Sequence, residues 1–265
     1  MKSSRFPTRS FFRSARPLVR FLTGAATLAT AGIGSFLAPA PEAAGAYPSS
    51  TMTWTGSTDD WFLTSNWSSN AVPGNGSVVS FAAAGSKNVT INSNTALARV
   101  RVEAGAGLYT VTVGNGVTWN IGNDGGYGLM AMDDLTIDGP GAVTLYAGSD
   151  NAISTGKTVT INAKLLVNGD LELWNEVGNT GGTLILNNSA NSISTVSLDS
   201  PTGMTIAFTV TGALGQSSQT GAINVKNNNG HVLRHDGSEE AIVYHSLTNN
   251  SVTLQQNGSG RQEWR

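Results

Sequence analysis

The sequence predicts an all-β protein built as a parallel β-solenoid. Short runs of alternating β-branched and polar residues follow one another from about residue 78 to about residue 210, and no segment after residue 46 shows a helical period. Turns rich in glycine and asparagine separate the runs. The runs group into units of roughly 20–25 residues, a length that suits one coil of a solenoid. A β-sandwich is the alternative, although it favours matched hairpins with two-residue turns.

Residues 1–46 have the composition of a secretory signal peptide. An apolar, small-residue core, FLTGAATLATAGIGSFLA, occupies residues 21–38. AGA at 44–46 provides a cleavage site, and APA at 38–40 is the alternative. Six basic residues and no acidic residue precede this core: Lys2, Arg5, Arg9, Arg13, Arg16 and Arg20. A membrane anchor is the alternative, because the core is almost long enough to span a bilayer. No twin arginine is present, so we expect export by the general secretory route.

Charge and cysteine content narrow the classes of function. Without residues 1–46 the chain keeps 15 − 6 = 9 Lys and Arg and 17 − 1 = 16 Asp and Glu, a formal net charge of 9 − 16 = −7. This excess of acid argues against a nucleic-acid partner. The chain contains no cysteine, so an exported form folds without disulfides.

Residues 47–81 open with a tryptophan-rich stretch, TWTGSTDDWFLTSNW at 53–67. Its tryptophans are either a sugar-binding platform or a cap over the first coil. Their position directly before the first regular strands favours the cap, because repeat arrays need atypical terminal units. The interleaved Phe62, Leu63, Val72 and Phe81 supply apolar partners for a buried cluster.

Residues 82–210 form the predicted solenoid repeats, and residues 211–265 are predicted to be terminal coils or an incomplete C-terminal region. The strand signal starts just before the repeats. The clearest runs are VVSF (78–81), NVTIN (88–92), ARVRVE (98–103), YTVTV (109–113), VTWNI (117–121), LTID (135–138), AVTLY (142–146), TVTIN (158–162), LLVNGDLEL (165–173), TLILN (183–187) and STVSL (194–198).

Two motifs resemble those of bacterial proteins with autotransporter-associated β-strand repeats. The first motif contains Trp54, Gly56, Trp61, Asn66 and Trp67, followed by Pro73 and Phe81. The second contains Leu135, Ile137, Gly139, Gly141, Val143 and Leu145. The resemblance implies a right-handed parallel β-helix that is secreted and displayed at the outer cell surface as a passenger or adhesin-like stalk.

Candidate metal ligands are few in this chain. His231 and His235 have the spacing of a helical zinc pair with Asp236 adjacent, but the surrounding sequence predicts turn and short strand, where the two histidines lie about 13 Å apart. We therefore interpret them as turn or surface residues. His245 belongs to no motif. The glycine-aspartate stretch GNDGGYG (122–128) suggests calcium in other proteins, but one copy is better explained as a turn.

Carboxylate pairs are the second kind of candidate, because polysaccharide-cleaving enzymes also use parallel β-helices. The pairs are Asp59 with Asp60, Asp133 with Asp134, and Asp170 with Glu172 beside Trp174. Glycoside hydrolysis needs two carboxyls across a cleft. The cations that could assist them, Lys157, Lys164 and Arg99, lie in no motif. We interpret these charges as solvated turn and edge residues.

The sequence thus predicts a non-catalytic, exported structural or adhesin-like solenoid without cofactor or metal. A carbohydrate-active enzyme or polysaccharide-binding module on the same fold is the alternative. Expected partners are surface glycans or other cell-surface proteins. We also expect end-to-end self-association, because a terminal coil with an unpaired edge is a template for strand pairing.

Overall fold

The computed structural model describes residues 51–123, 126–146, 148–174, 181–199, 203–214, 221–225, 230–243, 245–247 and 252–264. The chain divides into two units, Met1–Ala46 and Tyr47–Arg265. The described residues all belong to the second unit, so the predicted signal peptide lies outside them. None of the helices in the described part is long and apolar enough to cross a membrane.

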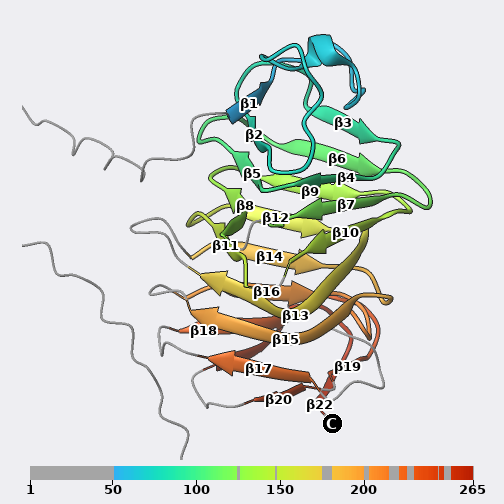
Figure 1. Cartoon of the computed structure of the whole chain (residues 1–265). Helices are drawn as coiled ribbons and strands as arrows, with labels where there is room; N and C mark the ends of the chain where they lie inside the picture. The colour runs from blue at the N-terminus through green and yellow to red at the C-terminus, as the bar shows by residue number, and fades with distance from the viewer. Residues whose placement is uncertain are drawn as a thin grey trace, which may run out of the picture. The chain divides into compact units, whose positions relative to one another are not determined.

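The regular secondary structure of the described residues consists of strands and one 3₁₀ turn, Thr64–Asn66. An eight-stranded sheet contains β3 (Asn88–Ile91), β6 (Tyr109–Val113), β9 (Leu135–Asp138), β12 (Thr158–Ile161), β14 (Thr183–Leu186), β16 (Thr205–Phe208), β18 (His231–His235) and β21 (Val252–Gln256). These strands stack in chain order from one end of the unit to the other (Figure 1).

A twelve-stranded sheet has two branches that meet in β13 (Lys164–Trp174). One branch contains β1 (Thr51–Trp54), β2 (Val78–Phe81), β5 (Arg99–Val102), β8 (Tyr127–Ala131) and β11 (Asp150–Ile153). The other contains β4 (Thr95–Leu97), β7 (Thr118–Ile121) and β10 (Ala142–Leu145). Beyond β13 the sheet continues through β15 (Ser192–Asp199), β17 (Gly221–Val225) and β20 (His245–Leu247), while β19 (Ala241–Val243) pairs with β22 (Gln262–Trp264).

Each named strand pairs with its neighbours in parallel, which confirms the solenoid and excludes a sandwich of antiparallel hairpins. Along the eight-stranded sheet Val89 pairs with Val111, Val111 with Ile137, and Ile137 with Ile161. One coil is therefore about two dozen residues long, close to the unit length that the sequence predicts. Every run named above coincides with a strand, and pairing continues past residue 210 through β18 and β21.

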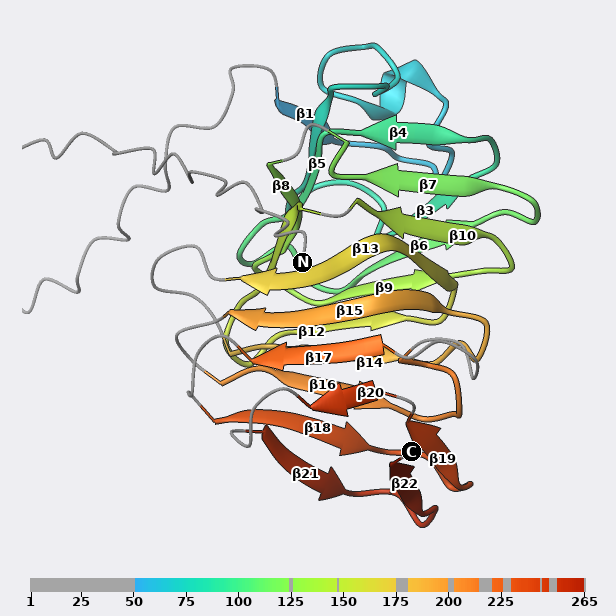
Figure 2. The same ribbon diagram turned by 60° about the horizontal axis from the view of Figure 1, so that its bottom comes forward.

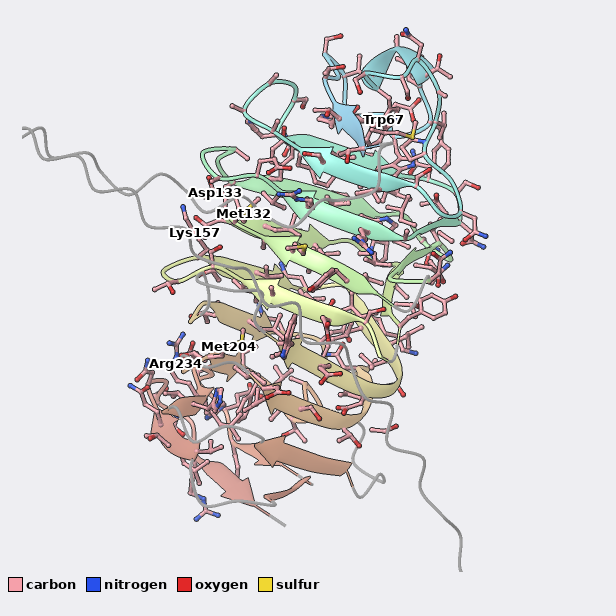
Figure 3. All side chains as sticks on the ribbon, turned by 60° about the vertical axis from the view of Figure 1, so that its left-hand side comes forward. Trp67, Met132, Asp133, Lys157, Met204 and Arg234 are labelled. Atoms are coloured by element: carbon pink, nitrogen blue, oxygen red, sulfur yellow. The ribbon has the colours of Figure 1, made fainter. Side chains whose placement is uncertain are left out.

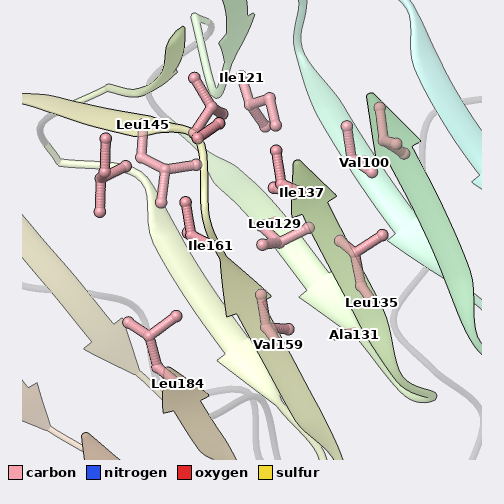
Figure 4. Close-up of a cluster of buried hydrophobic side chains, with 14 of the residues drawn as sticks. Val100, Ile121, Leu129, Ala131, Leu135, Ile137, Leu145, Val159, Ile161 and Leu184 are labelled. Carbon is pink, nitrogen blue, oxygen red and sulfur yellow. The ribbon is translucent and has the colours of Figure 1, made fainter. Parts of the chain in front are cut away.

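The core is a set of apolar columns that run along the solenoid. Alternate residues of each strand point inward, so Val111, Ile137, Ile161, Leu186 and Phe208 stack in register and all are buried. Figure 4 shows part of this packing, with Leu135, Ile137, Val159 and Ile161 from adjacent strands in one cluster. Burial of large aliphatic side chains in every coil is the main stabilising contribution, worth about 1.5–3 kcal/mol for each side chain.

The sequence prediction misses β8 and β11 because hydropathy does not alternate along them. In β8 four consecutive residues are buried, and β11 turns Asn151 into the core. The Asn151 side chain accepts the Leu129 amide at 3.0 Å and donates to the Ser149 and Glu172 carbonyls at 2.9 and 3.1 Å. A buried asparagine with these partners replaces an apolar residue, so period-2 hydropathy does not reveal the strand.

Candidate functional site

The tryptophan-rich segment lies at the N-terminal end of the solenoid, between β1 and β2 (Figure 1). Trp54 and Trp61 are 0% exposed and Trp67 is 1% exposed. The Trp67 ring lies edge-on to both others, with centroid distances of 5.0 Å to Trp54 and 4.7 Å to Trp61. Rings buried in this way offer no open face to a pyranose, so this cluster is not a sugar platform.

The ring cluster is continuous with the core of the first coils. Trp61 contacts Phe81 at 6.5 Å and Trp119 at 5.9 Å between centroids, and Phe81 contacts Tyr109 at 4.8 Å. The Trp67 indole donates to the Trp61 carbonyl at 2.8 Å, which holds the two rings at their edge-to-face angle. The segment therefore packs as part of the core, with its polar indole groups largely directed at backbone carbonyls.

Backbone groups of the same segment occupy strand edges that the solenoid would otherwise leave open. On β3, the Thr90 amide donates to the Asp59 carbonyl at 2.6 Å, and the Trp61 amide donates to the Thr90 carbonyl at 3.1 Å. On β1, the Ser68 amide donates to the Thr53 carbonyl at 2.9 Å. An unpaired edge is a template for association, so these bonds protect the first coil.

The other residues of the motif position the segment. A Cβ on Gly56 would lie 2.7 Å from Asn66 Cγ and 2.8 Å from the Trp54 ring, so only glycine fits there without displacement. The buried Asn66 amide donates to the Thr58 hydroxyl and the Asp60 carbonyl, both at 2.8 Å. Pro73 is also buried, and its carbonyl lies 3.5 Å from the Thr95 hydroxyl on β4.

The interpretation of His231 and His235 as turn or surface residues is wrong. His231 and His235 lie on β18 and point inward, where both are fully buried. His231 Nδ1 accepts the Met204 amide at 3.1 Å, and the His235 ring stacks on Phe208 at 5.4 Å. The coil register sets this direction, because His235 pairs with the inward-facing Phe208. His245 lies on β20, and its side chain is outside the described residues.

The carboxylate of Asp133 is tied into the corner between β8 and β9. It accepts the Gly107 amide at 2.8 Å and the Lys157 ammonium at 2.6 Å, and it is only 7% exposed (Figure 3). These bonds, with that from Lys157 the largest, lower the pKa of Asp133 to about 2. The neighbouring Asp134 accepts the Thr158 amide at 2.7 Å. A carboxylate with so low a pKa is a poor general base at neutral pH. The bonds of Asp133 and Asp134 instead connect neighbouring coils.

Lys87 and Tyr109 contact each other and are two further candidates that the sequence analysis missed. Burial lowers the pKa of Lys87, against a smaller raising effect of Asp133, and burial raises the pKa of Tyr109 to about 12. Perturbed groups of this kind also occur in active sites. Here the Lys87 ammonium donates to the Ala82 and Ala83 carbonyls and to the Tyr109 hydroxyl, at 3.1, 2.8 and 3.3 Å. Its three donors are occupied by the loop before β3 and by Tyr109 on β6, which indicates a structural role.

The pair Asp170 and Glu172 lies on the outer face of β13, within a strand that is paired on both sides, and not in a turn or at an edge. The register adds Asp150, which is directly opposite Glu172 on β11 and which sequence reasoning missed because β11 was not recognised. Asp170 accepts the Ser197 hydroxyl at 2.5 Å. We call Asp150, Asp170, Glu172 and Trp174 the acidic strip.

The aromatic rings beside the acidic strip stack on one another. Trp174 lies 6.0 Å from Tyr127 at an interplanar angle of 27°, and the Arg99 guanidinium lies 5.4 Å from the centroid of the Tyr127 ring. The stacked faces of the Trp174 and Tyr127 rings are therefore directed at each other and not at solvent. This ladder contributes cation–π and stacking energy rather than a flat platform.

The remaining sequence candidates have local roles. Asp60 accepts the Phe62 amide at 2.9 Å, and Asp59 lies 3.3 Å from the Thr90 hydroxyl. Lys164 begins β13 and donates its amide to the Gly141 carbonyl. The stretch 122–128 lies partly outside the described residues. Within the described ranges, no group of three or more His, Cys, Asp or Glu side chains is placed to hold a metal ion.

Comparison with known proteins adds no assignment: no family model, no curated protein and no solved structure matches this chain.

Proposed function

We propose that this chain is an exported, non-catalytic structural protein of the cell surface, in which the solenoid serves as an adhesin-like stalk. The observation that carries the proposal is that charged side chains between the coils bond to the chain itself. Asp133, Asp134 and Lys157 each bond a neighbouring coil, and Lys87 bonds its own loop. These bonds stiffen the stack.

The proposed route to the surface rests on residues 1–46 and on the resemblance to autotransporter-associated repeat proteins. A cleaved signal peptide predicts that the exported protein begins at Tyr47. N-terminal sequencing of the secreted chain tests this expectation, and an intact N-terminus would favour the membrane anchor instead.

The acidic strip is the observation that favours the second candidate, a polysaccharide-binding or polysaccharide-cleaving solenoid. Asp150 and Glu172 come from adjacent strands in the same register, so their Cα atoms are about 4.8 Å apart across the sheet. Carboxyls of this kind beside an aromatic residue occur in sugar-binding sites. Hydrolysis needs two carboxyls on opposite sides of the sugar, whereas Asp150 and Glu172 lie side by side on one sheet, which disfavours it.

Two measurements on the purified chain separate the candidates. A stalk without catalysis releases no reducing ends from polysaccharides, and any glycan it retains on an array is retained equally by Glu172→Gln. Release of reducing ends that is lost in Glu172→Gln, with an unchanged melting temperature, would overturn the proposal in favour of the enzyme. Asp138→Asn, an exposed carboxyl on β9, is the matched control.

A further inference from the structure

Strand β18 lies between β16 and β21 in the eight-stranded sheet (Figure 2). Its first residue, His231, is fully buried, and the ring nitrogen Nδ1 accepts the backbone amide of Met204 at 3.1 Å. Met204 directly precedes β16 and is also fully buried. The carbonyl of Met204 accepts the Val232 amide at 2.9 Å. Both backbone groups of Met204 are therefore bonded to β18, and one of the two bonds ends on a titratable ring.

The bond from Met204 fixes the protonation state of the His231 ring. Its donor is a backbone N–H, which can only donate, so Nδ1 has to accept. A neutral imidazole can accept through one nitrogen, whereas an imidazolium carries a hydrogen on both nitrogens and accepts through neither. The consequence depends on Nδ1 alone, whatever the other ring nitrogen contacts. Uptake of a proton removes the acceptor of a buried backbone amide, which costs free energy for as long as the two coils stay together.

Few titratable groups share the level of β18 in the solenoid. The strands paired with it, β16 (TIAF) and β21 (VTLQQ), contain none. On the outer face of β18, Arg234 pairs with Asp236 at 2.8 Å. In the other sheet, Asp199 ends β15 level with the acidic strip, and the side chain of His245 on β20 lies outside the described residues. The two inward histidines of β18 are therefore the described groups of this region that titrate near neutral pH.

His235, the second inward histidine, is bonded differently. Its Nδ1 lies 3.1 Å from the oxygen and 3.0 Å from the nitrogen of the Gln256 side-chain amide. That amide can turn to present either atom, so the contact is compatible with a neutral or a charged ring. His235 is equally buried on the same strand but has no backbone donor on Nδ1. It is therefore the matched comparison for His231.

We propose that the bond between Met204 and His231 is an acid-labile link, which holds β18 to β16 at neutral pH and releases β18 and β21 from the preceding coils when His231 takes up a proton. The closed form excludes the proton at Nδ1, whereas a histidine in the open chain binds it below about pH 6.5. The link is therefore intact above about pH 6.5 and is lost as the pH falls, with the open form gaining about tenfold for each pH unit. This release requires neither a glycan nor the stalk function.

Hydrogen exchange followed by mass spectrometry tests the release. We expect peptides that cover 203–208 and 231–235 to exchange at least about tenfold faster for each unit below about pH 6, after correction for the intrinsic pH dependence of exchange. Peptides that cover β9 and β12 should keep their protection, because these strands direct only leucine, isoleucine and valine inward. Protection of 203–208 that does not change with pH, or equal loss in all coils, would overturn the proposal.

Two glutamine variants separate the bond from the titration. In His231→Gln the side-chain oxygen can accept the Met204 amide, but glutamine takes up no proton in this range. We expect this variant to reduce the pH dependence of opening by about tenfold per pH unit. His235→Gln should retain at least a tenfold change per unit, and circular dichroism verifies that both variants fold. An unchanged pH dependence in His231→Gln, or its loss in His235→Gln, would contradict the assignment to His231.

Nitrogen NMR of the His231 ring tests the bond in the unaltered chain and needs no variant. At neutral pH we expect Nδ1 to be unprotonated and Nε2 to carry the hydrogen. On acidification the doubly protonated ring should appear only together with the loss of protection at 231–235. A doubly protonated ring in a chain whose 231–235 amides remain protected would refute the link. These measurements involve no polysaccharide, so their failure is distinct from failure of the proposed function.

Discussion

Trp61 is the residue on which the N-terminal packing depends most. Its fully buried ring contacts Trp67, Phe81 and Trp119, which belong to the segment itself, to β2 and to β7. Its indole nitrogen has no hydrogen-bond partner among the described groups, so the ring contributes through packing alone. That property allows shape to be separated from hydrogen bonding by substitution.

We expect Trp61→Ala to lower the free energy of unfolding by about 3–5 kcal/mol, the usual cost of emptying a large aromatic site. Trp61→Phe should cost less than Trp61→Ala, because it keeps an aromatic ring in the site and breaks no hydrogen bond of the Trp61 indole. Trp67→Phe should cost more than Trp61→Phe, since it removes the bond to the Trp61 carbonyl. Denaturant unfolding measures all three, and equal losses for the two phenylalanine variants would contradict this assignment.

Asp133 makes the stability of the folded chain depend on pH in the acidic range. Its pKa is lowered to about 2 in the folded chain from an ordinary value of 3.8, so the unfolded chain binds more protons between these values. The stabilisation is therefore present above about pH 4 and is lost as the pH falls toward about 2.

We expect Asp133→Asn to lower the free energy of unfolding at neutral pH by about 1–3 kcal/mol, the range for a disrupted buried bond to a charged group. We also expect the variant to lose less stability than the parent chain between about pH 4 and pH 2. Melting temperatures across this range measure both effects. Parallel pH profiles for the two proteins would show that Asp133 is not the responsible carboxyl, and Asp138→Asn is the control.

Turns decide how closely the elements stack. Between β9 and β10 the chain passes over the coil below, and Gly139 adopts a positive φ of 101°. A Cβ on Gly141 would lie 2.3 Å from the Gly114 carbonyl oxygen, a backbone atom that cannot move independently. The glycine at 141 is thus required by the close approach of two coils.

Gly141→Ala should therefore lower the free energy of unfolding by about 1–3 kcal/mol, the usual cost of overpacking. Gly74→Ala is the matched control, because no atom lies within 4 Å of a Cβ built there. We expect it to change stability by less than about 0.5 kcal/mol. Thermal unfolding compares the two, and a neutral Gly141→Ala would mean that the coils can separate without cost.

The molecule as a whole is a stack of coils with unequal ends. Continuous apolar columns and cross-coil bonds make neighbouring coils depend on one another, as in other repeat arrays. The N-terminal end is bonded by its own segment, whereas the outer edge of β21 has no described partner. The tryptophan-rich segment therefore joins the first coils to the same continuous core.

Local patterns in the sequence were sufficient for the fold class and for most strands of the described solenoid. Alternating runs such as YTVTV at 109–113 report their own burial, because side chains on a strand alternate between core and solvent. The tryptophan-rich segment was likewise recognisable from its composition and its place before the repeats, and the burial of its rings follows from the apolar residues between them.

Only the tertiary structure decided which residues of different coils meet. It placed Asp150 opposite Glu172 and turned His231 and His235 into the core. The register between coils determines these neighbours, and the lengths of the turns, which differ from coil to coil, set that register. It also joined Asp133 to Lys157 and left the outer edge of β21 without a described strand. These contacts are non-local, so no window of sequence contains them.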